Sequence, residues 1–471
     1  MTLLLSTYEL GRQPFGLASP AAWLRQAGVE VRTADLSRER LGEVPVERAR
    51  LVAFYLPMHT ATRLALPVIE RVRALNPGAH LCAYGLYAPL SADLLRSHGI
   101  DTILGPEFEA DLTTLATNLT QPDPTRPNLP QPAPTRPHPT QPAPTRPNPA
   151  QPDPTRLARL AFIAPDRRDL PALNRYAALQ MPDGTRRVVG YTEASRGCKH
   201  LCRHCPIVPV YGGQFRVVPV DVTLADIAAQ VEHGAQHITF GDPDFFNGPT
   251  HARRLVESIA ARFPGLGYDV TIKVEHLRNH ADLLPVLRDT GCLFVISAVE
   301  AVDDHILERL DKGHTREDVV EVVAAMRDVG LPLAPTFVAF TPWTTLEGYL
   351  DLLQTMVDLD LVEAVASIQL AIRLLLPAGS RLMELPEIRT LAGPLDPTAL
   401  AHAWRHPDPR VDQLQRDVQR LVGRTLHAPR AAVFDDVRAL ALAAAGQSAH
   451  DTDRPRAARA TVPYLTEPWY C

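Results

Sequence analysis

The sequence contains no apolar run that approaches the roughly 18 residues a helix needs to cross a membrane. Its opening, MTLLLSTYEL, lacks both the basic start and the long apolar stretch of a secretory signal. The formal net charge is only −5, from 48 basic and 53 acidic residues, which argues against a dedicated nucleic-acid binder. These absences predict a soluble, cytoplasmic protein with neither a membrane nor a nucleic acid as its partner.

Cysteine is also scarce, because six cysteines in 471 residues cannot form a disulfide framework. Three of the six nevertheless lie within eight residues, in the segment SRGCKHLCRHCP at 195–206. In a reducing compartment, such a group indicates metal binding or catalysis.

Proline, by contrast, is abundant, and 14 of the chain's 45 prolines lie in a ten-residue repeat at 121–156. Proline fixes φ and removes a hydrogen-bond donor, so this segment can form neither helix nor sheet. We expect 119–156 to be a disordered, polyproline-type linker between two globular parts. A ligand for proline-binding modules is the alternative.

The part before the linker, residues 1–118, alternates short apolar runs with amphipathic stretches. TLLLSTY, VEVRTADL, RLVAFYLP and AHLCAYGLY are typical of strands, and the segments between them of helices. This alternation predicts an α/β domain with a doubly wound parallel sheet. Ligands of such sheets bind at the carboxyl ends of the strands.

The part after the linker, residues 157–390, alternates in the same way through six strand–helix units. We expect a partial parallel (β/α)6 barrel, with its chemistry at the carboxyl ends of the strands. The cysteine loop lies at such a position, after the first strand. Residues 391–446 are charged and read as a small helical region, and 447–471 as an extended tail.

The cysteine loop allows three interpretations. Zinc could bind Cys198, Cys202, Cys205 and the neighbouring histidines, but structural zinc sites usually join two separate knuckles, and a second knuckle is missing. Cys202 and Cys205 have redox-pair spacing without the thioredoxin setting. A 4Fe-4S cluster held by all three thiolates would leave one iron open for a substrate or cofactor.

The Cys-x3-Cys-x2-Cys spacing after the first barrel strand resembles the signature of radical S-adenosylmethionine (radical SAM) enzymes. The segments FGDPDFFN, KVEHLR, SAVEAVDDHILERLDKGHT, APTFVAFTPWTT and IRLLLPAGSRL resemble the later strands of that family, in the same order. The resemblance covers about 190–385. It implies a 4Fe-4S cluster on the three cysteines and S-adenosylmethionine on the open iron.

The same resemblance assigns further residues to the cofactor. Gly241 and Asp242 stand where the family has a glycine-glycine-glutamate strand end that binds the amino group, but here the sequence reads GDPD, so Asp242 and Asp244 are both candidates. Glu300 would accept from the ribose hydroxyls, and Arg373 would pair with the carboxylate. A turn for the two aspartates and structural ion pairs for Glu300 and Arg373 are the alternatives.

Four polar residues near these positions are less specific. His200 and His204 are expected as solvated loop residues or as hydrogen-bond donors beside the ligands. Lys273 and Glu275 could line the mouth of the barrel.

The front domain resembles the cobalamin-binding type that often precedes this barrel. The Asp-x-His-x-x-Gly loop that supplies a histidine ligand is absent, because YELGRQPFG follows the first strand. Two interpretations of this domain are therefore possible. It could bind cobalamin without a histidine ligand, or it could be a scaffold that binds no cofactor.

The tail VPYLTEPWYC resembles a branch whose chains end in cysteine, then cysteine or selenocysteine, then alanine, glutamate and proline. A related branch transfers the 3-amino-3-carboxypropyl group of S-adenosylmethionine to trivalent arsenic. We therefore expect Cys471 to take part in catalysis, because soft donors suit a soft atom. The selenoprotein hypothesis expects a UGA codon after codon 471, followed in frame by Ala-Glu-Pro codons.

The sequence thus predicts a radical SAM enzyme that acts on a small-molecule substrate and draws electrons from a donor such as flavodoxin or ferredoxin. A zinc-binding regulatory module and an inactive scaffold that bears a cluster are the alternatives.

Overall fold

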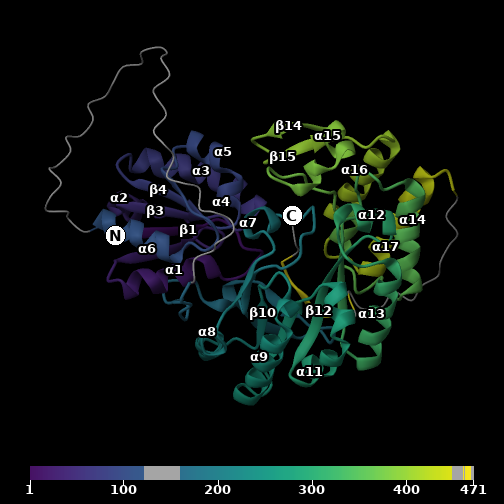
Figure 1. The fold of residues 1–471 in the computed structure, drawn as a ribbon, viewed down its shortest axis with the longest axis horizontal. Helices are drawn as coiled ribbons and strands as arrows, with labels where there is room; N and C mark the ends of the chain where they lie inside the picture. The colour runs from purple at the N-terminus through teal and green to yellow at the C-terminus, as the bar shows by residue number, and fades with distance from the viewer. Residues whose placement is uncertain (121–159, 448–459, 461, 468–471) are drawn as a thin grey trace, which may run out of the picture.

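The computed structural model describes residues 1–120, 160–447, 460 and 462–467. Within these residues, a smaller α/β domain lies beside a larger one (Figure 1). The proline-rich repeat and Cys471 fall outside the described residues, so the expectations about them are not examined by the structure. Among the described residues, no helix has the length and apolar character required to cross a bilayer.

The front domain is built on a five-stranded parallel sheet in the order β2-β1-β3-β4-β5. Its three central strands are short, largely apolar and buried, as expected for a sheet that is covered on both faces, whereas the edge strand β2 also carries polar residues. The strands are β1 (Thr2–Ser6), β2 (Val31–Asp35), β3 (Leu51–Tyr55), β4 (His80–Tyr84) and β5 (Thr102–Ile103).

Alternate residues of these strands feed two hydrophobic cores, one on each face. One face packs against α1 (Phe15–Gln26) and α6 (Glu109–Thr120), and Cys82 is buried there as a small core residue. The other face packs against the remaining helices, which are α2 (Glu43–Arg48), α3 (His59–Leu75), α4 (Tyr87–Leu90) and α5 (Ala92–Ser97). The doubly wound sheet expected from the sequence is confirmed.

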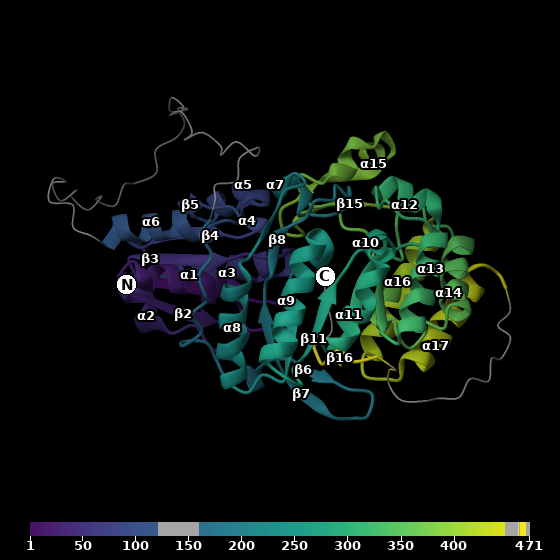
Figure 2. The same ribbon diagram turned by 60° about the horizontal axis from the view of Figure 1, so that its bottom comes forward.

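The larger domain contains a curled half-barrel sheet in the order β13-β12-β11-β10-β7-β6-β16 (Figure 2). Five of these strands are parallel: β7 (Arg186–Thr192), β10 (His237–Phe240), β11 (Gly267–Thr271), β12 (Cys292–Glu300) and β13 (Leu333–Phe337). Two short strands, β6 (Ala178–Gln180) and β16 (Tyr464–Leu465), extend the sheet with antiparallel pairing.

Helices cover the outside of this sheet. They are α8 (Val220–Glu232), α9 (Pro249–Arg262), α10 (Val274–Asn279), α11 (Leu284–Asp289), α12 (Asp304–Leu310), α13 (Arg316–Val329) and α14 (Leu346–Asp358). A strand, then a helix, then a parallel strand is the repeating unit, as expected.

The sixth barrel strand expected from the sequence is reduced to one parallel bridge between Phe340 and Arg373. The residues before it, Ser367–Ala371, form a 3-10 helix instead. Beyond Phe340 the ladder cannot continue, because Thr341 donates its backbone N–H to the Thr344 side chain and Pro342 has no N–H to donate.

The region after the barrel is not wholly helical, which corrects the expectation for 391–446. An antiparallel hairpin of β14 (Ala392–Asp396) and β15 (Ala401–Trp404) follows the short helix α15 (Pro386–Leu391). Two long helices come next, α16 (Pro409–Arg424) and α17 (Arg430–Ala444), and they pack on the barrel core.

The described part of the tail returns to the barrel. Because β16 is antiparallel to β6 and β6 is antiparallel to β7, β16 runs in the direction of the parallel barrel strands. The next described residues reach the front domain, where Glu467 forms an ion pair with Arg38 at 2.6 Å.

A buried ionic contact joins the two domains. Arg196, on β8 (Ser195–Gly197), donates to both oxygens of Glu109 at 2.6 and 3.0 Å. Ser19 donates to the same carboxylate at 2.7 Å. The start of α6 is thereby held against the strand that leads into the cysteine loop.

Candidate functional site

The candidate site lies at the carboxyl edge of the half-barrel, where the loops that follow neighbouring parallel strands meet. The cysteine loop follows β7 and β8, Gly241 follows β10, His276 lies on the helix after β11, and Glu300 ends β12. The residues that the sequence assigned to these loops are therefore gathered at one edge of the sheet.

The three clustered cysteines are free thiols at this edge. Cys202 is buried, and Cys198 and Cys205 are partly buried. Burial, followed by the neighbouring Cys202 and Cys198 thiols, raises the pKa of Cys205 to about 12, and burial also raises the pKa of Cys198. Metal cations replace the protons of thiols when they bind, so three thiols on one loop suit a metal cluster.

The loop that bears the thiols is anchored on both sides. Arg203 donates its backbone N–H to the Leu310 carbonyl at 2.9 Å, and Arg381 donates to the Leu201 carbonyl at 2.6 Å. On the side of Cys198, the Asn247 side-chain oxygen accepts from the Lys199 backbone N–H at 3.2 Å. These bonds fix the path of the loop backbone that carries the three thiols.

Gly241 and Asp242 support the start of the loop. A side chain at Gly241 would place its Cβ 1.8 Å from the hydroxyl oxygen of Tyr191, so only glycine fits there. The Asp242 carboxylate accepts from the Ala194 backbone N–H at 2.9 Å and from the Ser195 hydroxyl at 2.5 Å. Burial raises the pKa of Asp242 to about 7, although these hydrogen bonds oppose the shift.

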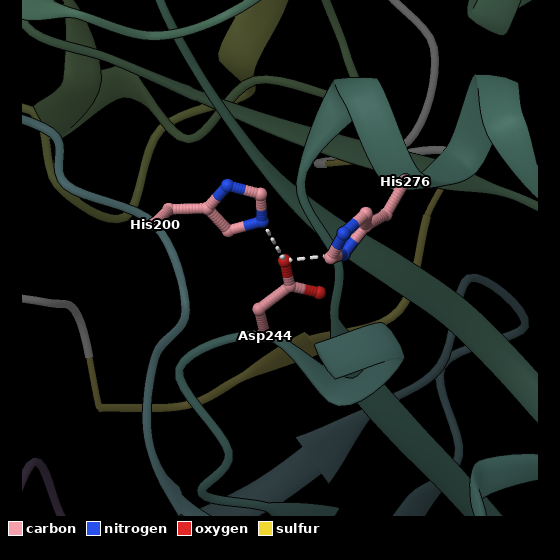
Figure 3. Close-up of side chains that lie close together, drawn as sticks. All are labelled: His200, Asp244 and His276. Carbon is pink, nitrogen blue, oxygen red and sulfur yellow. Dashed lines mark ion pairs between the residues drawn. The ribbon is translucent and has the colours of Figure 1, made fainter. Parts of the chain in front are cut away.

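Asp244 lies between two histidines (Figure 3). Its Oδ2 is 2.7 Å from His276 Nδ1 and 3.3 Å from His200 Nε2, while its Oδ1 accepts from the Phe246 backbone N–H at 3.1 Å. Burial alone would raise the pKa of Asp244, but the two imidazoles outweigh it and lower the pKa to about 2. Of the two roles that the sequence left open for His200, this contact fits the donor beside the ligands rather than the solvated loop residue.

Glu300 forms a second charged group on the other side of the loop. Its Oε1 is 3.2 Å from His204 Nε2 and 3.5 Å from Lys312 Nζ. Burial would raise the pKa of Glu300, but Lys312 and His204 outweigh it and lower the pKa to about 2. Glu300 has a φ of 70°, a strained left-handed conformation for a glutamate that turns the chain at the end of β12.

Arg373 is separate from this group. Its guanidinium pairs with Asp412 at 2.7 Å, donates to the Trp404 carbonyl at 2.9 Å and lies over the Trp404 ring. The described structure thus gives Arg373 the partners of a structural ion pair.

Two of the contacting residues were not singled out in the sequence analysis. His276 and Lys312 lie in KVEHLR and SAVEAVDDHILERLDKGHT, two segments that resemble the family's later strands, but that resemblance gave neither side chain a role. Lys273 and Glu275, which the sequence placed near the barrel mouth, do reach the site: Lys273 Nζ is 3.1 Å from His200 Nδ1 and 3.1 Å from Glu275 Oε2.

A cavity opens between the two domains, next to the cysteine loop. It faces the carboxyl ends of the front-sheet strands at the β1/β3 switch point, where doubly wound sheets bind ligands. Its lining includes two carboxyl groups whose pKa is raised by burial, Glu9 and Glu193. The cavity is also lined by Leu10, Arg12, Tyr55, Gly85, Phe108 and Gly241.

Comparison with known proteins gives a family match for the barrel. Residues 192–351 match the model of the radical SAM superfamily. Among curated proteins, the chain is 24% identical over 192 residues to the ribosomal protein uS12 methylthiotransferase RimO of Parabacteroides distasonis, covering 37% of this chain and 42% of that protein. It is 26% identical over 174 residues to the tRNA-2-methylthio-N(6)-dimethylallyladenosine synthase of Haemophilus influenzae, covering 34% and 36%. The chain therefore spans about two fifths of the length of these relatives.

Solved structures match more of the chain. The cobalamin-dependent radical enzyme OxsB, with aqua-cobalamin and S-adenosylmethionine bound, superposes with a TM-score of 0.66 at 12% identity, covering 90% of this chain and 67% of that one. The radical methyltransferase TsrM of Kitasatospora setae, with tryptophan and a cofactor analogue bound, gives 0.63 at 17% identity, covering 95% of both chains. At these identities the likeness establishes the shared fold, including the order of front domain and barrel. Residues 192–351 thus match the radical SAM superfamily, and the chain shares the arrangement of front domain and barrel with two cobalamin-dependent radical SAM enzymes.

Proposed function

We propose that Cys198, Cys202 and Cys205 hold a 4Fe-4S cluster and that the enzyme uses it to cleave S-adenosylmethionine and modify a small molecule. The family implies both cofactors. The observation that supports the proposal most strongly is three free thiols on one anchored loop at the carboxyl edge of a barrel. When bound and reduced, the cluster supplies the electron that breaks a carbon–sulfur bond of the cofactor.

The chain's own residues position this chemistry. Asp242 holds the backbone at 194–195 and so orients the loop, which assigns it to the loop rather than to the cofactor. Gly241 lines the cavity beside the loop without a side chain, and we assign its backbone to the cofactor's amino group. Glu300, ionised and close to the loop, is assigned to the ribose. We do not assign Arg373 to the carboxylate of the cofactor, because Asp412 already neutralises its guanidinium.

Iron analysis separates this proposal from the zinc alternative. Protein purified and reconstituted without oxygen should be brown and hold about four irons and four sulfides per chain. Colourless protein with one zinc would support the regulatory module instead. A full cluster that leaves S-adenosylmethionine intact under reduction would support the inactive scaffold.

We propose that the substrate reacts in the cavity between the domains and that cobalamin is a candidate ligand of the same cavity. Its walls are largely aromatic and apolar, including Tyr55 and Phe108, and Gly85 leaves the edge after β4 without a side chain, features that suit a flat corrin ring. No histidine is among the described lining residues. Cobalamin bound here would therefore lack a histidine ligand, and the electron paramagnetic resonance spectrum of its cobalt(II) form should show no imidazole nitrogen coupling.

The C-terminal tail suggests a more specific substrate for the reaction. Glu467 lies against Gly11, between the cavity-lining Leu10 and Arg12. Cys471 follows four residues later, and four residues span at most about 14 Å of extended chain. We propose that the Cys471 thiol binds a soft substrate atom such as arsenic(III). The 3-amino-3-carboxypropyl group would pass to that atom as its carbon–sulfur bond in S-adenosylmethionine breaks, with 5′-methylthioadenosine as the leaving group and an external donor supplying the electrons through the cluster. Cys471→Ser should then keep the cluster and lose product formation from arsenite, and unchanged product formation would refute this assignment.

A further inference from the structure

The site contains a second set of metal-binding groups that the cluster does not use. His200, Asp244 and His276 come from three separate segments: the cysteine loop, the loop after β10 and the helix α10. They place two imidazole nitrogens and one carboxylate oxygen within 4.8 Å of one another. Figure 3 shows both rings directed toward the same carboxylate oxygen.

The distances match those between atoms that share one ion. Asp244 Oδ2 lies 2.7 Å from His276 Nδ1 and 3.3 Å from His200 Nε2. Metal–nitrogen and metal–oxygen bonds of about 2.0–2.2 Å place neighbouring ligand atoms roughly 3 to 3.5 Å apart. A small movement of the His276 ring would therefore admit an ion without any change in the backbone.

The three converging atoms contact one another and no other polar group. His200 Nε2, Asp244 Oδ2 and His276 Nδ1 are all buried and form ion pairs at 2.7 and 3.3 Å, and none makes a well-aligned hydrogen bond among the described residues. The Asp244 side chain is 2% exposed and that of His276 is 3% exposed. Buried polar atoms are normally hydrogen-bonded, so three metal-binding atoms that converge with only one another as partners suit a shared cation.

The surrounding groups resemble the supports of known metal ligands. A metal-bound imidazole usually donates its other N–H to a carboxylate, and Glu275 Oε2 lies 3.6 Å from His200 Nδ1. The Lys273 ammonium donates to the same nitrogen at 3.1 Å and pairs with Glu275 at 3.1 Å. An ion on His200 Nε2 would therefore require Nδ1 to take up the proton and donate to Glu275 in place of accepting from Lys273. The Phe246 backbone N–H donates to Oδ1 of Asp244 and thereby fixes the orientation of that carboxylate.

We propose that His200, Asp244 and His276 bind one divalent first-row transition ion, such as zinc or iron(II), at a site distinct from the three cysteines. Two imidazoles and one carboxylate, without thiolate, are the donors that such ions accept. Three protein ligands leave coordination positions open for water or for a ligand with an amino or carboxylate group. Because His200 lies between Cys198 and Cys202, the ion would also tie the cysteine loop to β10 and α10.

Cobalt(II) binding tests the site without interference from the cluster. The full chain with Cys198, Cys202 and Cys205 all changed to serine should bind one equivalent of cobalt(II), with ligand-field absorption and no thiolate charge-transfer band. Adding Asp244→Asn or His276→Ala should weaken this binding by more than about 100-fold. His305→Ala, on the exposed start of α12, is the matched control and should bind as the parent does. Equal cobalt affinity in all variants, with circular dichroism showing that they are folded, would overturn the proposal.

A second measurement uses the unaltered cysteines. Wild-type protein carrying the cluster should take up one zinc, and X-ray absorption at the zinc edge should show nitrogen and oxygen neighbours only. Asp244→Asn with a full complement of iron should lose that zinc. Sulfur neighbours, or no zinc uptake by cluster-loaded protein, would refute the site, whereas loss of S-adenosylmethionine cleavage alone would concern the proposed function and not this site.

Discussion

The clustered cysteines differ from the other described cysteines in their neighbours, and Cys198 and Cys205 also in being only partly buried. Cys82 and Cys292 are buried in strands, where each thiol meets a backbone carbonyl. Cys202 is equally buried, but it lies on a loop with two other thiols. The difference in surroundings predicts a difference in iron binding.

Cys202→Ala should remove most of the iron and all cleavage of S-adenosylmethionine, because two thiolates cannot hold the cube. Cys82→Ala and Cys292→Ala are the controls and should keep the iron content of the wild type. Iron and sulfide assays on anaerobically reconstituted proteins measure this. A Cys202→Ala protein with full iron would refute the ligand assignment.

The raised pKa of Asp242 predicts how the stability of the protein depends on pH. Its folded pKa of about 7 lies above the value of about 3.9 for an unfolded aspartate. Between these values the folded protein retains a proton that the unfolded chain releases, so the free energy of unfolding falls as pH rises from about 4 to about 7.

Asp242→Asn cannot titrate, so its unfolding free energy should fall less steeply than that of the wild type over this pH range. Urea unfolding of cluster-free protein at several pH values measures both slopes. Identical slopes would show that Asp242 is already ionised in the folded protein.

At the scale of elements, the sequence predicted the alternating strands and helices and missed the irregular segments between them. The span of β12 follows the apolar run CLFVISAVE residue for residue, and the position of the cysteine loop follows from the first barrel strand. The 3-10 helix at Ser367–Ala371 was missed, because its apolar residues are also typical of a strand.

The site was predictable only in part, for a related physical reason. Its cysteines form a motif with fixed spacing, whereas His276 and Lys312 reach the loop only after folding brings α10 and the segment after α12 to it. Pairings between distant segments leave no local pattern. The partners of Arg373 were unpredictable for the same reason, since Trp404 belongs to a hairpin that the sequence did not indicate.

The repeat at 121–156 makes a prediction at this scale. Removing one ten-residue repeat should leave iron content and S-adenosylmethionine cleavage within about twofold of the wild type, because the cost of closing a loop changes only slowly with its length. Iron assays and product analysis compare the two proteins. A folded deletion variant without activity would show that the repeat is a docking element.

At the scale of the whole molecule, the front domain and barrel are joined by a contact that excludes water. Arg196 and Glu109 are 7% and 1% exposed, and Glu193 pairs with the same guanidinium at 2.8 Å. Because Arg196 precedes the cysteine loop by two residues, domain contact and loop position are mechanically connected.

Arg196→Met should destabilise the protein by about 3–5 kcal/mol, because it leaves two buried carboxylates without their cation. Adding Glu109→Gln should restore part of the loss. Chemical denaturation of both variants measures the effect, and a loss below about 1 kcal/mol would show that water or a proton compensates the carboxylates.

The central claim is that this loop supports reductive cleavage of S-adenosylmethionine, and product analysis tests it most directly. Anaerobically reconstituted protein, reduced with dithionite, is incubated with S-adenosylmethionine, and the adenosine-containing product is quantified. We expect 5′-deoxyadenosine or 5′-methylthioadenosine from the wild type and neither from Cys198→Ala, Cys202→Ala or Cys205→Ala. Intact S-adenosylmethionine in the presence of a full, reduced cluster, or equal cleavage by the cysteine variants, would contradict the account.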